Sequence, residues 1–476
     1  MRKLSAWIHS HPIIAMTSAF VALFLVSHFF LNWRAERRWQ AYAEAARARG
    51  VKLHLTDFER PEIPDAENFA ALPMMRAVFA NGAKSPMALP EKDRPTFGDV
   101  RKGERMDWEK WQAYFKDAGF IAETTDSPPR EVLRALEHYT PQFQEWSEWK
   151  TRPHCRFALD LKAGAAMPLP HLSTFQHAAV LFSLRMRAHL ALGDSIAASA
   201  DFREGFQAYN ALVEEPTLIC GLVRISVLSI LIDGIGDGLA NHAWTESDLA
   251  KIDADIATVR MWEDYRFSMS SERGFTNWIH EIISKSPPST RSQFLTGIAG
   301  MWTGPGPVVI ACVPNRIYRD NQLRANQYFD EMQARVSADG MRFDPDGATP
   351  SGPETLSGFD TLYFFLLRQF SSFRLVENKF ALTNARLDQT RLAIAIERCR
   401  IARGAIPESL AELVPDFIAE LPRDIYTGQP MIYRRKEVGG FLLYSVGPDR
   451  RDDGGAFDAR NSEKNQPDWV WLHSRD

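Results

Sequence analysis

The hydrophobic pattern of the chain begins with one long apolar run. Residues 12–31 carry no charge, and basic residues flank them on both sides. A helix of this length crosses the hydrocarbon core of a bilayer. The residues that follow, including Trp33, are bulky and lack the small-residue cleavage site of a signal peptide. We therefore expect an uncleaved membrane anchor in residues 1–33.

Beyond the anchor, apolar residues recur at helical spacing. The clearest case is a pair of apolar stripes separated by the turn signal Leu192-Gly193-Asp194. The members of the two stripes are Ala179, Phe182, Met186 and Leu190 before the turn, and Phe202, Phe206, Tyr209 and Val213 after it. This pattern predicts a helical hairpin. Its turn resembles that of tetratricopeptide-type hairpins, although no period of roughly 34 residues is sustained.

A second apolar stretch, residues 218–239, is apolar on nearly every side, which predicts a buried central helix. Charged residues interrupt it, so its longest uncharged part is too short to span a membrane. Arg224 lies on the opposite side of this helix from Asp233, and its partner must come from another segment. Asp264 and Glu272 are candidates. We expect a buried ion pair between helices, and the alternative is an active-site role for Arg224.

Capping and loop signals divide the rest of the body. Thr245 and Asp248 have the spacing of a capping box at the start of the next helix. Residues 297–314 mix glycine and proline with apolar residues, which predicts a buried or membrane-touching loop. That stretch lacks the motifs of a phosphate-binding or dinucleotide-binding turn. Residues 339–360 are expected to form a linker, because an alignment with the EF-hand calcium loop fails.

Composition changes this picture little. A length of 476 residues predicts two or three domains. The net charge of −4, with 24% charged and 45% hydrophobic residues, indicates neither nucleic-acid binding nor disorder. The four cysteines have no C-x-x-C spacing, which argues against a zinc site and a disulfide-rich scaffold. We expect them to be buried thiols.

The C-terminal region, residues 377–476, follows a different pattern. A helix is expected to end at Gly404, and Pro407 to start a short helix that continues to Val414. Residues 431–434 and 441–446 have the composition of two antiparallel strands joined by the glycine pair 439–440. An acidic loop follows the second strand. Together these elements predict a small α+β module.

Sequence elements in this module carry a family resemblance. The segments AIPESLAELVP (405–415) and YSVGPDRRDDGG (444–455), with the later Asp468-Trp469, resemble the soluble C-terminal half of major pseudopilins of type II secretion systems. In pseudopilins a membrane helix with a processed methylation motif directly precedes this module, whereas here the anchor lies far upstream. The whole arrangement resembles large bacterial single-pass envelope proteins.

The resemblance also bears on the side of the membrane that the body occupies. The excess of arginine just after the apolar run, counted alone, favours a cytoplasmic body. Long soluble regions, however, cross membranes largely regardless of charge, and pseudopilin modules are extracytoplasmic. We therefore expect an anchor in the inner (cytoplasmic) membrane and a periplasmic body.

The resemblance further implies a calcium site in the acidic loop. Pseudopilin calcium loops correspond to Asp449, Asp453 and Asp468 here, with backbone carbonyls as additional ligands. Hard oxygen ligands of this kind favour calcium. As an EF-hand the loop fails. In the alternative interpretation, Arg450 and Arg451 neutralise the aspartates in a solvated turn.

The expected fold is mainly α, with tetratricopeptide-like helical hairpins after the transmembrane helix and a small pseudopilin-like α+β module at the end. The corresponding domains are residues 1–33, 34–376 and 377–476. No hydrolase, zinc-protease or Walker motif stands out. We expect a membrane-tethered structural or protein-interaction protein of the cell envelope, with the membrane and other envelope proteins as partners. The alternatives are a secretion or pilus component that docks through its module, and a hydrolase with a site near Arg224.

Overall fold

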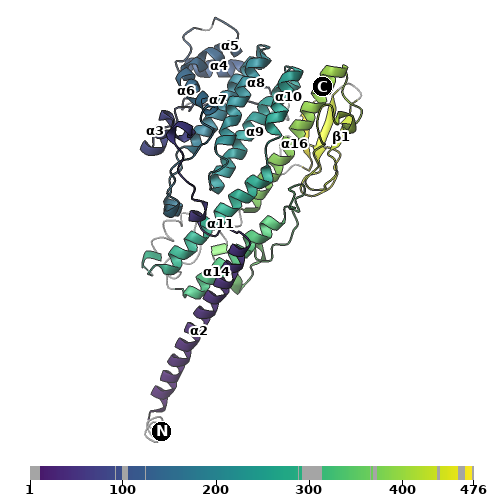
Figure 1. The fold of residues 1–476 in the computed structure, drawn as a ribbon. Helices are drawn as coiled ribbons and strands as arrows, with labels where there is room; N and C mark the ends of the chain where they lie inside the picture. Colours follow the sequence, from purple (N-terminus) through teal and green to yellow (C-terminus); the bar gives the residue numbers. More distant parts are fainter. Residues whose placement is uncertain are drawn as a thin grey trace. The chain divides into compact units, whose positions relative to one another are not determined.

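The computed structural model describes most of the chain, and most of the described residues are helical (Figure 1). A three-stranded antiparallel sheet lies near the C-terminus. This confirms the predicted mainly helical fold with a small C-terminal sheet. The described residues are 11–91, 93–98, 105–123, 125–287, 289–291, 313–364, 366–367, 373–436, 440–458 and 467–473.

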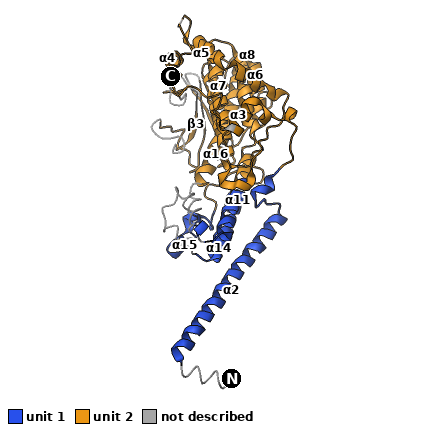
Figure 2. Cartoon of the chain, turned by 90° about the vertical axis from the view of Figure 1, so that its left-hand side faces the viewer, with its two compact units in different colours: residues 1–59, 270–332, 348–372 blue, residues 60–269, 333–347, 373–476 orange. Residues whose placement is uncertain are grey.

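The chain groups into two compact units, drawn in different colours in Figure 2. Unit 1 comprises residues 1–59, 270–332 and 348–372, and unit 2 comprises residues 60–269, 333–347 and 373–476. The predicted domain boundaries fall inside helices: 33/34 lies within α2 and 376/377 within α16. The predicted division into three domains stays a prediction.

Unit 1 is built around α2, which runs unbroken from the apolar segment into the body of the unit. Its other elements are η1 (Leu55–Phe58), the second part of α11 (Met261–Lys285), α14 (Asn315–Ala334), η9 (Pro353–Thr355) and α15 (Phe359–Tyr363). The most apolar window of α2 (Pro12–Ala48) has a mean hydropathy of 2.1, and none of it is buried. This helix is long and apolar enough to cross a membrane.

Unit 2 holds the central helices and the sheet. Its longer helices are α3 (Pro73–Asn81), α4 (Trp108–Asp117), α5 (Pro128–Leu136), α6 (Thr140–Trp146), α7 (Leu172–Ala191), α8 (Ser195–Ala211), α9 (Leu218–Ala240), α10 (Glu246–Ile256) and α16 (Phe373–Arg403), with the first part of α11. Its 3-10 segments are η2 (Asp65–Glu67), η3 (Phe69–Ala71), η5 (Glu137–Tyr139), η6 (Ser147–Lys150), η7 (Leu161–Ala166) and η11 (Leu410–Leu413).

The predicted hairpin is formed by α7 and α8. Gly193 takes a φ of +79° in the connecting turn, a conformation that glycine adopts without steric cost. Asp194 then caps α8 by accepting a hydrogen bond from the backbone N–H of Ala197 at 3.0 Å. α9 packs against α7 so closely that a methyl group at Gly234 would clash with Met186. As predicted, α9 is a buried core helix, and its apolar window is 61% buried.

The Thr245 cap predicted at α10 is present, but the Asp248 carboxylate bonds to the Thr245 hydroxyl and not to its backbone N–H, so the capping box is incomplete. The hydroxyl of Thr245 accepts the backbone N–H of Asp248, and the Asp248 carboxylate accepts hydrogen bonds from Thr245 and from Ser195 of α8, at 2.6 and 2.8 Å. In the C-terminal region, α16 ends before Gly404 as predicted. The short helix expected from Pro407 instead begins at Leu410. Ser409 and Glu412 form a capping box there, so the helix starts three residues later than predicted.

The C-terminal sheet has the strand order β1-β2-β3. β1 (Ile432–Arg435) and β2 (Phe441–Ser445) confirm the two predicted antiparallel strands, although Gly439 of the predicted turn lies outside the described residues. β3 (Trp469–His473) was not predicted. It adds to the free edge of β2, and its backbone accepts a hydrogen bond at Trp469 from Gln389 of α16 at 2.5 Å. This bond fixes β3 to α16.

Candidate functional site

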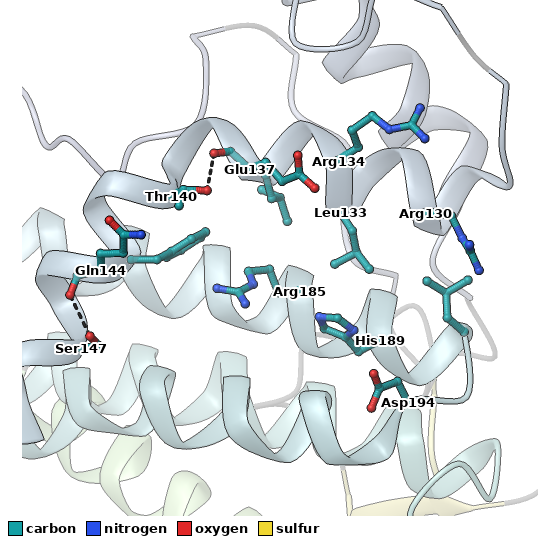
Figure 3. A pocket seen from close by; sticks show the side chains of 13 residues that line it. Arg130, Leu133, Arg134, Glu137, Thr140, Gln144, Ser147, Arg185, His189 and Asp194 are labelled. Carbon is teal, nitrogen blue, oxygen red and sulfur yellow. Dashed lines mark hydrogen bonds between the residues drawn. The ribbon is translucent and has the colours of Figure 1, made fainter.

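A hollow of about 820 Å³ opens in unit 2 between α5 and α6 on one side and α7 on the other (Figure 3). Arg130 and Arg134 of α5 and Arg185 of α7 contribute positive charge to its lining. Leu133 and Phe143 contribute apolar surface. A concave surface with both kinds of group is the usual form of a ligand-binding site.

The arginines of α5 reach the hollow because of the helical repeat. Pro128 and Pro129 start this helix in its first turn, where the absent N–H costs nothing. Val132 and Leu136 are buried on one face, while Arg130 and Arg134, four residues apart, share another. These two side chains are 60% and 48% exposed, and both lie near the carboxylate of Asp126, at 3.5 and 3.9 Å.

Arg134 is held in place by a buried carboxylate. The guanidinium of Arg134 donates to both carboxylate oxygens of Glu131 at 3.0 Å, and Glu131 is fully buried. Glu131 also accepts the backbone N–H groups of Thr125 and Asp126, at 3.0 and 2.9 Å. The loop before α5 and the arginine are thus organised by one side chain.

The floor of the hollow carries an ion cluster between α7 and α8. Arg185 and His189, one helical turn apart on α7, lie side by side in Figure 3. The carboxylate of Asp201 on α8 lies 3.1 Å from the guanidinium of Arg185 and 3.6 Å from the imidazole of His189. Only 3% of Asp201 is exposed, and one of its oxygens has no hydrogen-bond partner. The hydrogen bonds and charges around this carboxylate therefore only partly offset the cost of burying it.

Burial sets the protonation behaviour of this cluster. It raises the pKa of Asp201 to about 7, although the Arg185 charge opposes the change. Burial also lowers the pKa of His189, and Arg185 lowers it further. The guanidinium of Arg185 lies 4.4 Å from the ring centre of Phe143, which holds it in position. Because a guanidinium has five N–H donors, Arg185 can bind a second carboxylate besides Asp201.

Arg224 is buried and paired across helices, as predicted. Its partner is Asp264 at 2.5 Å, one of the two candidates. Arg224 also donates to the backbone carbonyl of Tyr209 at 3.1 Å and lies 4.1 Å from the centre of that ring, while the Tyr209 hydroxyl donates to Asp264. The three groups satisfy one another, and Arg224 is only 5% exposed. This is the geometry of a structural ion pair.

The three aspartates predicted to bind calcium have mixed surroundings. Asp449 accepts the backbone N–H of Arg451 at 3.0 Å. Asp468 is fully buried and accepts the N–H of Gly455 at 2.8 Å, and its second oxygen has no partner. Burial raises the pKa of Asp468. Within the described ranges no group of three or more His, Cys, Asp or Glu is placed to hold a metal. The calcium site with Asp449, Asp453 and Asp468 stays a prediction.

The alternative interpretation of this loop needs a correction. Arg450 was expected to neutralise the aspartates beside it, but its guanidinium pairs with Asp344 and with Asp346, the latter at 3.2 Å. Residues 344–346 are therefore tied to the terminal module rather than forming part of a free linker. The other predicted loop, residues 297–314, lies outside the described residues except for its last two positions.

Comparison of the chain with protein-family models, with curated proteins and with solved structures found no match. The pseudopilin-like and tetratricopeptide-like resemblances therefore stay predictions.

The hollow was missed from the sequence. One signal was available, because Arg185 and His189 lie four residues apart on the polar side of a predicted helix. The other wall comes from α5 and α6, and no sequence pattern indicates that these short helices pack beside α7.

Proposed function

We propose that the chain is a membrane-tethered interaction protein of the bacterial cell envelope that holds an acidic segment of a partner protein in the hollow between α5 and α7. The hollow is the observation that carries this proposal. Its lining holds three arginines from two walls and two acids, of which Asp194 is engaged in capping α8 and Glu137 is exposed. Leucine and phenylalanine side chains between the charges favour a peptide over a free small anion.

The partner's carboxylate is expected to bind Arg185 and Arg134. Arg185 is already fixed by Phe143 and Asp201, and Arg134 by Glu131, so little side-chain entropy is lost on binding. Bidentate arginine–carboxylate pairs add geometric specificity. Apolar partner residues would cover Leu133.

Site-specific photo-crosslinking in cells tests this function. A photoreactive residue at Gln144, in the lining, should give a defined crosslinked partner, and Arg185→Gln should abolish that crosslink. The same probe at Ser247, exposed on α10 and outside the lining, is the matched control. A crosslink at Gln144 that persists in Arg185→Gln, or that is equally strong from Ser247, would contradict the proposal.

The location is part of the proposal. We place α2 in the inner membrane and the two units in the periplasm, supported by the exposed apolar half of α2 and by the pseudopilin resemblance. Alkaline phosphatase fused after Asp476 becomes active only in the periplasm, so an inactive, stably produced fusion would reverse this orientation. Docking of the terminal module to secretion components is the second candidate, and co-purification with those components would favour it.

A further inference from the structure

The position of unit 1 relative to a bilayer follows from the contacts of α2 with α14. The two helices run in parallel: the backbone N–H of Arg316 donates to Asn32 at 3.0 Å, and Arg319 pairs with Glu36 at 2.8 Å. Further along, the Tyr42 hydroxyl donates to the carbonyl of Asn326 at 3.2 Å. Since the apolar run ends just before Asn32, the first turn of α14 lies at the level where α2 leaves the bilayer.

α11 runs antiparallel to α14 within unit 1. Far from the apolar run Arg273 pairs with Asp330 at 2.8 Å, and midway Gln322 donates to Asn277 at 3.1 Å. Beyond the end of α11, Arg291 donates to Asn315 at 2.6 Å. The end of α11 and the residues after it therefore lie beside the first turn of α14. Residues 32–38, 285–287, 289–291 and 313–319 together form what we term the membrane-proximal end.

Positive charge prevails at the membrane-proximal end. The sequence has no aspartate or glutamate between Glu281 and Asp320, but that stretch holds one lysine and three arginines. The acids at its borders are already paired, Glu281 with Lys285 at 3.0 Å and Asp320 with Arg38. The side chains of Arg34 and Arg316 form no ion pair with any described residue.

Arg291 adds a buried charge without a counterion. It is only 9% exposed, and its guanidinium donates to the carbonyls of Ser284, Ser286 and Val313 and to the amide oxygen of Asn315, at 2.6 to 3.3 Å. No carboxylate of the described residues pairs with it. Carbonyl dipoles satisfy its hydrogen bonds but leave its net charge, which favours an anion near this end.

We propose that the membrane-proximal end binds anionic phospholipid headgroups through Arg34 and Arg316, with Lys285, which also pairs with Glu281, and Arg291 adding to the positive potential. The inference rests on the membrane anchoring proposed above. Trp33 is 56% exposed beside these cations, with Arg37 over its ring at 5.5 Å, an arrangement typical of the headgroup region. Anionic lipids attract juxtamembrane cations over a distance of about a Debye length.

Hydrogen exchange of the full chain in nanodiscs tests the proposal. The discs contain either phosphatidylcholine alone or an equal mixture of phosphatidylcholine and phosphatidylglycerol. Amides of residues 282–291 and 313–322 should exchange several-fold more slowly in the anionic discs, and high salt should remove the difference. The triple variant Arg34→Gln, Lys285→Gln, Arg316→Gln should exchange alike in both discs.

The matched control removes three exposed lysines of unit 2, as Lys110→Gln, Lys116→Gln, Lys251→Gln, and should retain the lipid effect. Equal exchange of the wild-type chain in both discs would overturn the lipid site. Protection in neutral discs on adding inorganic phosphate would show a site for free anions instead, and would overturn the lipid assignment. A chain that does not enter either disc would overturn the anchor itself, which separates the two failures.

Discussion

Arg224 and Asp201 are both buried in unit 2, but their polar atoms are satisfied to different extents. Arg224 has a carboxylate, a carbonyl and an aromatic face around its guanidinium, and each of these groups is satisfied in turn. Asp201 has Arg185 and His189, two lining residues of the hollow, as neighbours but keeps one oxygen without a hydrogen bond. The first arrangement stabilises the fold, and the second leaves a group that titrates near neutral pH.

Removal of Arg224 should be strongly destabilising. Arg224→Ala leaves the Asp264 carboxylate buried without its partner, at a cost on the order of 3–5 kcal/mol in unfolding free energy. Arg203→Ala breaks an exposed pair with Asp255 and should cost less than about 1 kcal/mol. Thermal melting of both variants measures the difference. A wild-type melting temperature for Arg224→Ala would show that the ion pair contributes nothing to stability.

Asp201 should make stability depend on pH. Its pKa is about 7 in the folded chain against an ordinary value of 3.8, so the folded state binds this proton more tightly than the unfolded state does. The resulting stabilisation is present below pH 3.8 and is lost as the pH rises to about 7. Asp201→Asn cannot undergo this loss. The melting temperature of the variant minus that of the wild type should therefore be more positive at pH 8 than at pH 5.

The control for this titration is Asp416→Asn, whose carboxyl side chain is 66% exposed. It removes a surface carboxyl of the same type and so measures the effect of the substitution away from the buried cluster. An Asp201→Asn difference that is independent of pH would mean that the carboxyl keeps an ordinary pKa in the folded chain.

At the scale of elements, the apolar helices α2 and α9 have the same mean hydropathy of 2.1 but opposite surroundings. Most of the apolar window of α9 is buried in unit 2, whereas none of the apolar window of α2 is buried. Hydrophobicity alone does not separate a membrane helix from a core helix. The interrupting charges of α9, which find partners in the fold, do separate them.

Deletion of residues 1–33 should therefore release the protein from the membrane. The remaining chain keeps electrostatic contacts with lipid at most, and carbonate extraction removes such contacts. The full chain should stay in the carbonate-resistant membrane fraction. A truncated chain that also resists carbonate would indicate a second membrane-inserted segment, and residues 297–314 would be the first to test.

Elements with a regular apolar repeat could be predicted, and those with other signals could not. The α7–α8 hairpin, α9 and strands β1 and β2 all follow from spacing. α14 buries polar residues such as Asn321, Gln322 and Asn326, which bond to neighbouring segments, so polar positions interrupt the apolar pattern of its inner face. β3 is separated from β2 by the acidic loop, and pairing across that distance leaves no local pattern.

The acidic loop gives a further prediction. If Asp449, Asp453 and Asp468 bind calcium, titration of the full chain should release or absorb heat, and calcium should raise the melting temperature of the wild type but not of Asp453→Ala. The unpartnered buried oxygen of Asp468 is the observation that favours a cation here. Absence of heat at millimolar calcium would leave only a turn held by backbone hydrogen bonds.

At the scale of the whole molecule, each compact unit is assembled from distant parts of the sequence. The hollow in unit 2 needs α5 and α6 beside α7, and the membrane-proximal end in unit 1 brings the end of the apolar run beside two segments that follow it by more than 200 residues. A single sequence indicates which faces are apolar, but not which faces meet. The candidate residues it does indicate are those that interrupt a pattern, such as Arg224.

The unbroken course of α2 has a mechanical consequence. A transmembrane helix whose hydrophobic stretch is longer than the hydrocarbon core is thick accommodates the mismatch by tilting. If α2 spans the bilayer as we propose, it continues without a break into its contacts with α14, from Asn32 to Tyr42, so we expect any tilt of α2 to turn α14 with it. Spin labels on α14 in bilayers of increasing acyl-chain length would measure this rotation, and a constant orientation would exclude it. Bilayer thickness would then set the angle at which unit 1 faces the water.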